Sequence, residues 1–257
     1  MNQHLQLGLI IEGNSTHSEI LRLPSIVQEL GPVKSSSFRV ARRHSNQVRA
    51  GYPITKYEEL HPAGLTLIKV ADSSVARIVE ELCASDLPLR GMGFALCESW
   101  LPSETLAGLA KRGAHVATVL RLPSVSAPRF VVEGDGKAVR QTRRFLTRNG
   151  ARSIELSPEH KHLVFASELL AMSIPLWLLS QAKHLLREGG LSGNVLWDIL
   201  DQMARQMVLD FSRGSRVEAS GPLAECPPAT TKSHLAVLER TQPSIASMLR
   251  EHLRLVL

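Results

Sequence analysis

The sequence predicts an α/β fold, a doubly wound parallel sheet followed by an all-helical C-terminal domain. Short apolar runs rich in β-branched residues alternate with segments of helical periodicity through the first 157 residues. Strands that alternate with helices in this way usually form a parallel sheet. After Pro158 the strand patterns stop and only helical periodicity continues. We therefore expect two domains, over residues 1–157 and 158–257.

The first domain is expected to begin with a strand at 5–11, because LQLGLII is apolar enough to be buried on both faces. A helix at 16–30 follows, interrupted near Pro24, which cannot donate a helical hydrogen bond. Asp72 and Ser73 lie just before a later helix and can cap its N-terminus. The remaining strands are expected at 38–41, 65–70, 92–96, 114–120, 130–134 and 153–156, and the remaining helices at 75–83, 103–112 and 136–149.

The second domain is expected to contain helices at 159–188, 192–212 and 232–256. The most apolar stretch, 163–179, is shorter than the ~20 residues that span a bilayer. We therefore predict a helix that is buried on most sides inside the helical domain and kinked near Pro175.

The loop after the first strand reads Ile11-Glu12-Gly13-Asn14-Ser15-Thr16, at the place where a dinucleotide-binding fold carries three glycines. Only the second glycine is present, as Gly13. Glu12 adds a carboxylate close to the expected position of two phosphates. Gly13, Asn14, Ser15 and Thr16 are the candidate phosphate-binding residues of a Rossmann-like domain, and we expect the altered loop to weaken dinucleotide affinity.

Two further groups of residues follow predicted strands. Arg42, Arg43 and Ser45 come after the strand expected at 38–41, where an arginine could pair with the 2′-phosphate of NADP; alternatively the two arginines are simply solvated. Ala71 and Asp72 follow the strand at 65–70, at the edge of the sheet where open α/β folds bind ligands, although Asp72 as a helix cap needs no ligand.

Four motifs resemble those of a known family. They are Phe130-Val131-Val132-Glu133-Gly134-Asp135, Pro158-Glu159, Gly221-Pro222 and Thr230-Thr231-Lys232-Ser233-His234-Leu235. In order and spacing they resemble NADP-linked oxidoreductases that pair a Rossmann domain with an all-helical C-terminal domain of unknown function, relatives of 6-phosphogluconate dehydrogenase, pyrroline-5-carboxylate reductase and ketopantoate reductase. The resemblance implies NADP as cofactor, hydride transfer to a small substrate, and a homodimer formed by the C-terminal helices.

The chain departs from this family where polar groups are expected. Leu96-Cys97-Glu98-Ser99 replaces a His-Thr-Ser-Gly turn, and Val164-Phe165-Ala166-Ser167 replaces a Tyr-His-Ala-Ala motif. Glu168 follows on the same apolar helix, where an unpaired carboxylate is expensive to bury. We take Glu168 as the candidate catalytic residue facing the cleft between the domains; the alternative is that it points to solvent or pairs with a lysine or arginine.

Composition argues against several classes of function. The net charge of +6 is spread along the chain and aromatic residues make up 4%, so nucleic-acid binding is not expected. The three cysteines lie far apart and form no CxxC pair, and the histidines show no metal-ligand spacing. The N-terminus lacks the basic region of a signal peptide, so we expect a cytoplasmic protein.

Two classes of function remain. The first is an NADP-dependent oxidoreductase that acts on a small molecule, possessing a weakened cofactor loop. The second is a non-catalytic Rossmann-like homodimer that binds another ligand or a protein partner. In either class we expect a ligand between the domains, bordered by Gly13, Asn14, Arg42, Asp72, Leu96 and Glu168.

Overall fold

The computed structural model describes residues 6–13, 18–214 and 221–256. The chain divides into two compact units, Met1–Ser167 and Glu168–Leu257. Pro158, where the sequence suggests a boundary, begins a short three-ten turn that belongs to the first unit.

An eight-stranded sheet forms the centre of the first unit. Its strands are β1 (Leu7–Ile11), β2 (Leu30–Lys34), β3 (Tyr52–Pro53), β4 (Leu65–Lys69), β5 (Gly93–Cys97), β6 (His115–Leu122), β7 (Arg129–Gly134) and β8 (Arg152–Glu155). Their order is β3-β2-β1-β4-β5-β6-β7-β8. Neighbours are parallel except β6 and β7, because the short segment 123–128 leaves no room for a crossover helix. The expected α/β fold is confirmed, with this one antiparallel pair as a difference.

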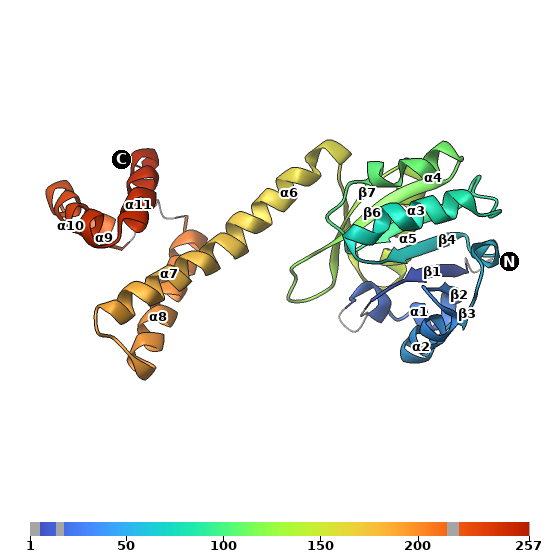
Figure 1. Cartoon of the computed structure of the whole chain (residues 1–257), viewed down its shortest axis with the longest axis horizontal. Helices are drawn as coiled ribbons and strands as arrows, with labels where there is room; N and C mark the ends of the chain where they lie inside the picture. The colour runs from blue at the N-terminus through green and yellow to red at the C-terminus, as the bar shows by residue number, and fades with distance from the viewer. Residues whose placement is uncertain (1–5, 14–17, 215–220, 257) are drawn as a thin grey trace. The chain divides into compact units, whose positions relative to one another are not determined.

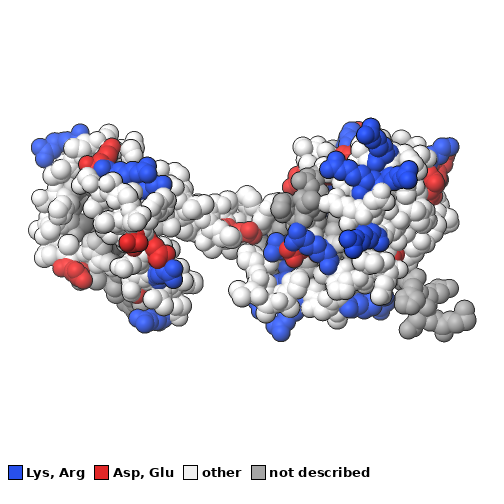
Figure 2. All heavy atoms as spheres, turned by 90° about the horizontal axis from the view of Figure 1, so that it is seen from below, with Lys and Arg blue, Asp and Glu red and all other residues white. Residues whose placement is uncertain are grey.

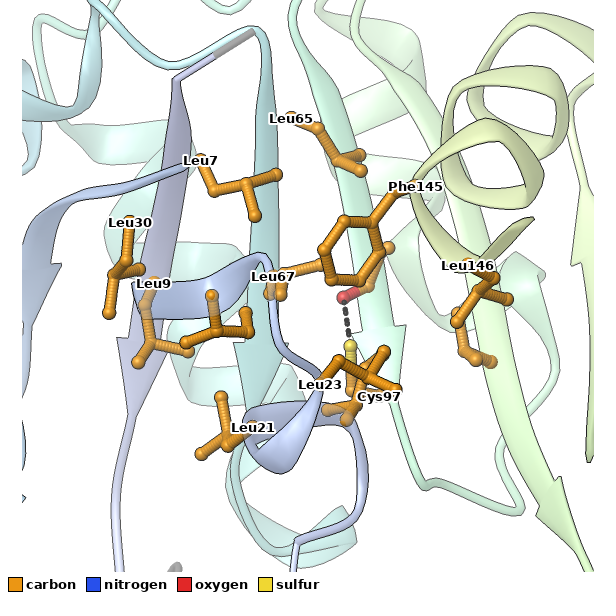
Figure 3. Packing of buried hydrophobic residues seen from close by; sticks show 14 of the residues in the cluster. Leu7, Leu9, Leu21, Leu23, Leu30, Leu65, Leu67, Cys97, Phe145 and Leu146 are labelled. Carbon is orange, nitrogen blue, oxygen red and sulfur yellow. Dashed lines mark hydrogen bonds between the residues drawn. The ribbon is translucent and has the colours of Figure 1, made fainter. Parts of the chain in front are cut away.

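Helices cover both faces of the sheet (Figure 1). The cluster on one face includes side chains of α1 (Ile26–Glu29), α2 (Phe38–Val48) and α5 (Gly136–Arg148). The cluster on the other face includes side chains of α3 (Val75–Ala84) and α4 (Ala107–Lys111). Successive strand residues alternate between the clusters, as a pleated strand requires. Figure 3 shows Phe145 of α5 packed against leucines of the sheet. Three-ten turns lie at Ile20–Arg22, Tyr57–Leu60, Asp72–Ser74, Ser103–Leu106 and Pro158–His160.

The second strand lies earlier in the chain than the sequence suggests. The segment expected as a strand at 38–41 begins helix α2, which Ser37 caps by accepting a hydrogen bond from the Val40 amide at 3.3 Å. The strand itself is β2, which contains Pro32. Leu7 and Leu9 of β1 pair with Leu30 and Val33, so β2 carries one extra residue at this point. Such a bulge accommodates a proline inside a sheet.

The first helix is much shorter than expected. Instead of a helix over 16–30, the chain forms a three-ten turn at Ile20–Arg22 and the single-turn helix α1, and Leu30 already belongs to β2. Pro24 lies between the two pieces, where its missing amide hydrogen and its ring oppose a continuous helix. A helix of four residues has only a small summed dipole compared with the long helix that normally follows this loop.

The second unit is helical. Helix α6 (Lys161–Glu168), which belongs to the first unit except for its last residue, continues through a π-helical turn (Leu169–Ser173) into α7 (Ile174–Glu188). The π turn directly precedes the segment with Pro175, which cannot donate a regular helical hydrogen bond. The remaining helices are α8 (Gly193–Ser212), α9 (Pro222–Glu225), α10 (Pro228–Thr241) and α11 (Pro243–Val256). The helix expected over 232–256 is therefore two helices, because Pro243 starts a new one.

The prediction that the apolar stretch 163–179 is buried on most sides is wrong. The whole helix 158–188 has 31 residues, a mean hydropathy of 1.7 in its most apolar window, and no buried residue in that window. By length and composition alone it is apolar enough to cross a membrane. Large exposed apolar side chains continue on α8, and charged groups leave broad uncharged areas on this unit (Figure 2).

Candidate functional site

The candidate site is the edge of the sheet at the carboxyl ends of β1, β2, β4 and β5. Strands β2 and β3 follow β1 on one side of the sheet, and β5 to β8 follow β4 on the other side. The topological switch point therefore lies between β1 and β4. Open α/β sheets bind ligands at this place. An ionisable side chain lies at the end of each of these strands: Glu12 after β1, Lys34 at the end of β2, Lys69 at the end of β4, and Glu98 after β5.

Glu98 spans the switch point. Its Oε1 accepts a hydrogen bond from the Ile20 amide at 3.1 Å, and its Oε2 lies 3.0 Å from the Lys69 ammonium. Its backbone is in the left-handed region at φ 54°, where a residue other than glycine is uncommon. The amide of Glu98 donates to the Val119 carbonyl at 2.6 Å, which fixes this conformation. An internal carboxylate thus occupies a position between an ammonium and a backbone amide, two groups that bind phosphate in other proteins.

Glu12 is also paired within the chain. Its carboxylate contacts the guanidinium of Arg77 on α3, which contacts Glu81 at 2.6 Å. Glu81 accepts a hydrogen bond from the Tyr57 hydroxyl at 2.7 Å, and burial together with this bond raises the pKa of Tyr57. The Lys34 ammonium lies 4.8 Å from the centre of the Tyr57 ring. The charges along this edge are therefore largely neutralised by one another.

The phosphate loop is described only at its start. Gly13 has φ 78°, and a Cβ added there would meet no atom of the described residues. Asn14, Ser15 and Thr16 lie outside the described residues, so their predicted contacts with phosphate stay predictions. The part of the chain that follows the loop presents the Ile20 amide to Glu98.

The end of the second strand, where contact with the adenosine ribose is expected, lies earlier in the chain than predicted. Because β2 ends at Lys34, the residues at its end are Ser35, Ser36 and Ser37, with Arg39 in the first turn of α2. Arg42 and Arg43 do not follow a strand but lie exposed within α2. The assignment of Arg42, Arg43 and Ser45 to a strand end is therefore wrong.

Ser45 has a structural role. Its side chain is buried, and its hydroxyl lies 2.9 Å from the Ala50 carbonyl and 2.6 Å from the Gly51 carbonyl, where it closes the turn after α2. At the end of β2, by contrast, Ser36 and Arg39 are exposed. The Ser35 hydroxyl donates to the Ile11 carbonyl at 2.5 Å and ties the ends of β1 and β2 together.

Asp72 does not cap α3. Its carboxylate accepts a hydrogen bond from the Ser99 hydroxyl at 2.6 Å, which links the loop after β4 to the loop after β5. Asp72 itself begins a three-ten turn, and the Ala71 carbonyl accepts from the Ser74 amide at 2.8 Å. Asp72 is exposed and Ala71 is its neighbour at the switch point, so their predicted contact with a ligand stays a prediction.

A buried ion pair lies beside this edge, and the sequence reasoning missed it. Glu133 on β7 is fully buried and accepts hydrogen bonds from the Ser103 amide at 2.9 Å and the Thr118 hydroxyl at 2.6 Å. The ammonium of Lys161, on the first turn of α6, lies 3.5 Å from Glu133, donates to Thr118 at 2.6 Å, and donates to the Leu101 carbonyl. The one available signal was a carboxylate inside the apolar strand 130–134, which must find a partner.

The pKa values of this pair follow from their surroundings. Burial opposes ionisation of Glu133, but the hydrogen bonds from Ser103 and Thr118 and the charge of Lys161 outweigh it, so the pKa of Glu133 is lowered. Burial lowers the pKa of Lys161, and Glu133 opposes that shift. The ion pair fastens the start of α6 to the sheet.

Leu96, Cys97 and Glu168 differ in how far they are buried. Leu96 is fully buried in the core cluster below the edge and is not a lining residue. Cys97 is fully buried and its thiol donates to the Ala95 carbonyl at 3.2 Å; burial, then the charge of Glu98, raises the pKa of this thiol. Glu168 is half-buried, and its Oε2 is shielded from solvent without a hydrogen-bond partner among the described residues. Its catalytic role stays a prediction.

A dinucleotide fits one end of this edge better than the other. The end of β2 presents exposed serines and an arginine without a carboxylate between residues 34 and 39, which suits an adenosine ribose that carries a 2′-phosphate. The switch point does not fit a pyrophosphate while Glu98 holds Lys69 and the Ile20 amide. Within the described ranges, no group of three His, Cys, Asp or Glu side chains could hold a metal ion.

Solved structures of several proteins share the fold of this chain. A candidate NADP oxidoreductase from Bacteroides fragilis is 15% identical with a TM-score of 0.71, covering 98% of this chain and 97% of that one. A protein from Thermotoga maritima is 19% identical with a TM-score of 0.68, covering 95% and 97%. An imine reductase from Myxococcus stipitatus in complex with NAD+ is 13% identical with a TM-score of 0.64, covering 97% and 94%.

These comparisons establish the fold, a Rossmann-like domain followed by a helical C-terminal region. No protein-family model matches the chain, and no curated protein matches it in sequence.

Proposed function

We propose that the chain is a nicotinamide-dinucleotide oxidoreductase of the 6-phosphogluconate dehydrogenase-like type, with low affinity for its cofactor. The observation that carries this proposal is the likeness over nearly the whole chain, sheet and helices together, to a candidate NADP oxidoreductase and to an imine reductase seen with NAD+. The pairing of Glu98 with Lys69 supports the low affinity, because a bound pyrophosphate must displace this carboxylate.

We further propose that NADP is favoured over NAD. Discrimination against the 2′-phosphate usually comes from an acidic residue at the end of the second strand, and none lies between Lys34 and Arg39. Ser36 and Ser37 can donate to phosphate oxygens, and Arg39 can form a charged pair. Arg39→Ala should weaken NADPH binding about tenfold and leave NADH binding unchanged, because one exposed charged pair contributes on the order of 1 kcal/mol. Equal weakening of both would contradict the assignment, and the exposed Arg144→Ala on α5 is the matched control.

Glu168 remains the residue that we assign to proton transfer on a small-molecule substrate. The support is chemical: its Oε2 is shielded from solvent and has no hydrogen-bond partner in the described chain. An unpaired carboxylate in such a place tends to have a function. Glu168→Gln should abolish turnover without loss of cofactor affinity, and retained turnover would remove the assignment.

A second candidate function is a non-catalytic homodimer that binds another ligand or a protein. The observation that favours it is the internal neutralisation of the phosphate edge by Glu98 and Glu12. NADPH separates the two functions: the oxidoreductase binds it at millimolar concentration and oxidises it with some carbonyl or imine substrate, whereas the non-catalytic protein does neither.

We propose that the C-terminal helices form the interface of a homodimer. The support is the exposed apolar surface of the second unit, where Leu176 is 69% and Phe211 84% exposed. Surfaces of this kind are generally covered by a partner. With its apolar helix covered in this way, we expect the protein to reside in the cytoplasm.

A further inference from the structure

A cavity in the first unit shares none of its lining residues with the paired charges of the strand edge. Its volume is about 710 Å³, within the range of small-molecule sites. The loop after β5 and the start of α6 form its walls. Its lining residues are Trp100, Leu101, Pro102, Glu104, Pro158, Glu159, Lys161, His162 and Phe165.

Aromatic rings form one part of the wall. The ring centroids of Trp100 and Phe165 are 5.2 Å apart with an interplanar angle of 74°, an edge-to-face contact. Phe165 is 43% exposed although it makes this contact. An edge-to-face pair leaves ring faces available, and the face of an aromatic ring attracts cations.

The charge of the lining is negative. Glu104 and Glu159 are exposed, and neither side chain forms a hydrogen bond or an ion pair with another residue in the described part of the chain. Lys161 is the one lysine or arginine of the lining. Its ammonium is paired with Glu133 and donates hydrogen bonds to the Thr118 hydroxyl and the Leu101 carbonyl. Lys161 also attracts Glu104 at longer range, but among the described residues neither Glu104 nor Glu159 has an ion-pair partner within 4 Å.

We propose that this cavity binds an organic cation, a small ammonium compound that carries an apolar group. The apolar part packs against Trp100 and Phe165, and the positive charge lies near Glu104 and Glu159. Aromatic rings with nearby carboxylates bind such cations because cation–π attraction and ion pairing add to the burial of apolar area. The proposal does not depend on nicotinamide cofactors, since the residues that carry it lie outside the phosphate edge.

Trp100 provides a direct readout. The chain has three tryptophans, and in the double variant Trp177→Phe/Trp197→Phe only Trp100 fluoresces. Benzyltrimethylammonium is the probe, because its charge is permanent. Its neutral isostere neopentylbenzene and the anion phenylacetate are the comparison compounds. We expect the probe to change Trp100 fluorescence saturably in the full chain without NADPH, and to bind at least about tenfold more tightly than either comparison compound.

Matched variants then locate the charge. Glu104→Gln and Glu159→Gln should each weaken probe binding about three- to tenfold, and Glu80→Gln, an exposed carboxylate on α3, should leave it unchanged. Equal binding of the neutral isostere, equal affinity in all three variants, or no saturable change at millimolar probe would each overturn the proposal. Loss of NADPH binding in a separate titration would affect only the proposed function.

Discussion

Replacement of Glu98 by glutamine should raise the affinity for NADPH. A carboxylate about 5 Å from a phosphate charge costs about 3 kcal/mol at an effective dielectric constant near 20. The Lys69 ammonium, 3.0 Å from Glu98 in the unmodified chain, becomes available to the phosphate in Glu98→Gln. The glutamine oxygen can still accept from the Ile20 amide, so the local backbone is retained. The expected gain of about 2 to 3 kcal/mol corresponds to roughly 30- to 150-fold.

Isothermal titration calorimetry of both proteins with NADPH measures this gain. Because the Glu98 side chain keeps some exposure to solvent, the gain should shrink as salt is raised. Glu80→Gln removes an exposed charge on α3 and controls for net charge. An affinity in Glu98→Gln within twofold of the unmodified protein, with an unchanged melting temperature, would refute the assignment of Glu98 as the obstacle.

The other predictions concern stability and assembly. Lys161→Met leaves Glu133 buried without its cation and should lower the free energy of unfolding by about 3 kcal/mol in urea titration; the double variant with Glu133→Gln should recover part of this loss, and additive losses would contradict the coupling. Burial, with the charge of Arg43, lowers the pKa of His44 below 6.5, so the unfolded chain binds more protons and the melting temperature should fall as pH drops below about 6.5. His44→Gln should remove this first decline. A second decline in melting temperature below pH 4.5 should remain, because the lowered pKa of Glu133 stabilises the folded chain and this stabilisation is lost as the carboxylate is protonated. Leu176→Glu should convert a dimer to a monomer in light scattering at micromolar concentration, and a monomeric unmodified protein would remove the proposed interface.

The sequence predicted the parts of the fold that depend on local pattern. The apolar runs of β1, β4 and β5 are readable because both faces of these strands are buried. The strand β2 was predicted at the wrong place because its Gly31 and Pro32 are uncommon inside strands. Only the pairing of β2 with β1 shows the bulge that accommodates them.

The candidate site was less predictable, because its decisive contacts join distant parts of the chain. Glu98 was readable as a carboxylate beside a thiol, but its bond to the Ile20 amide crosses 78 residues. Likewise, nothing local to Lys161 indicates that Glu133 lies 3.5 Å from its ammonium. Sequence spacing identifies which strands end at the edge, whereas the pairing of charges at that edge requires the folded chain.

The most direct test of the account is calorimetric titration of the unmodified protein with NADPH. We predict binding in the range of tens to hundreds of micromolar, because the fold offers a dinucleotide edge and Glu98 must leave it first. A sub-micromolar dissociation constant would contradict the claim that internal carboxylates weaken the site. No binding at millimolar NADPH, in the unmodified protein and in Glu98→Gln alike, would contradict the proposed oxidoreductase.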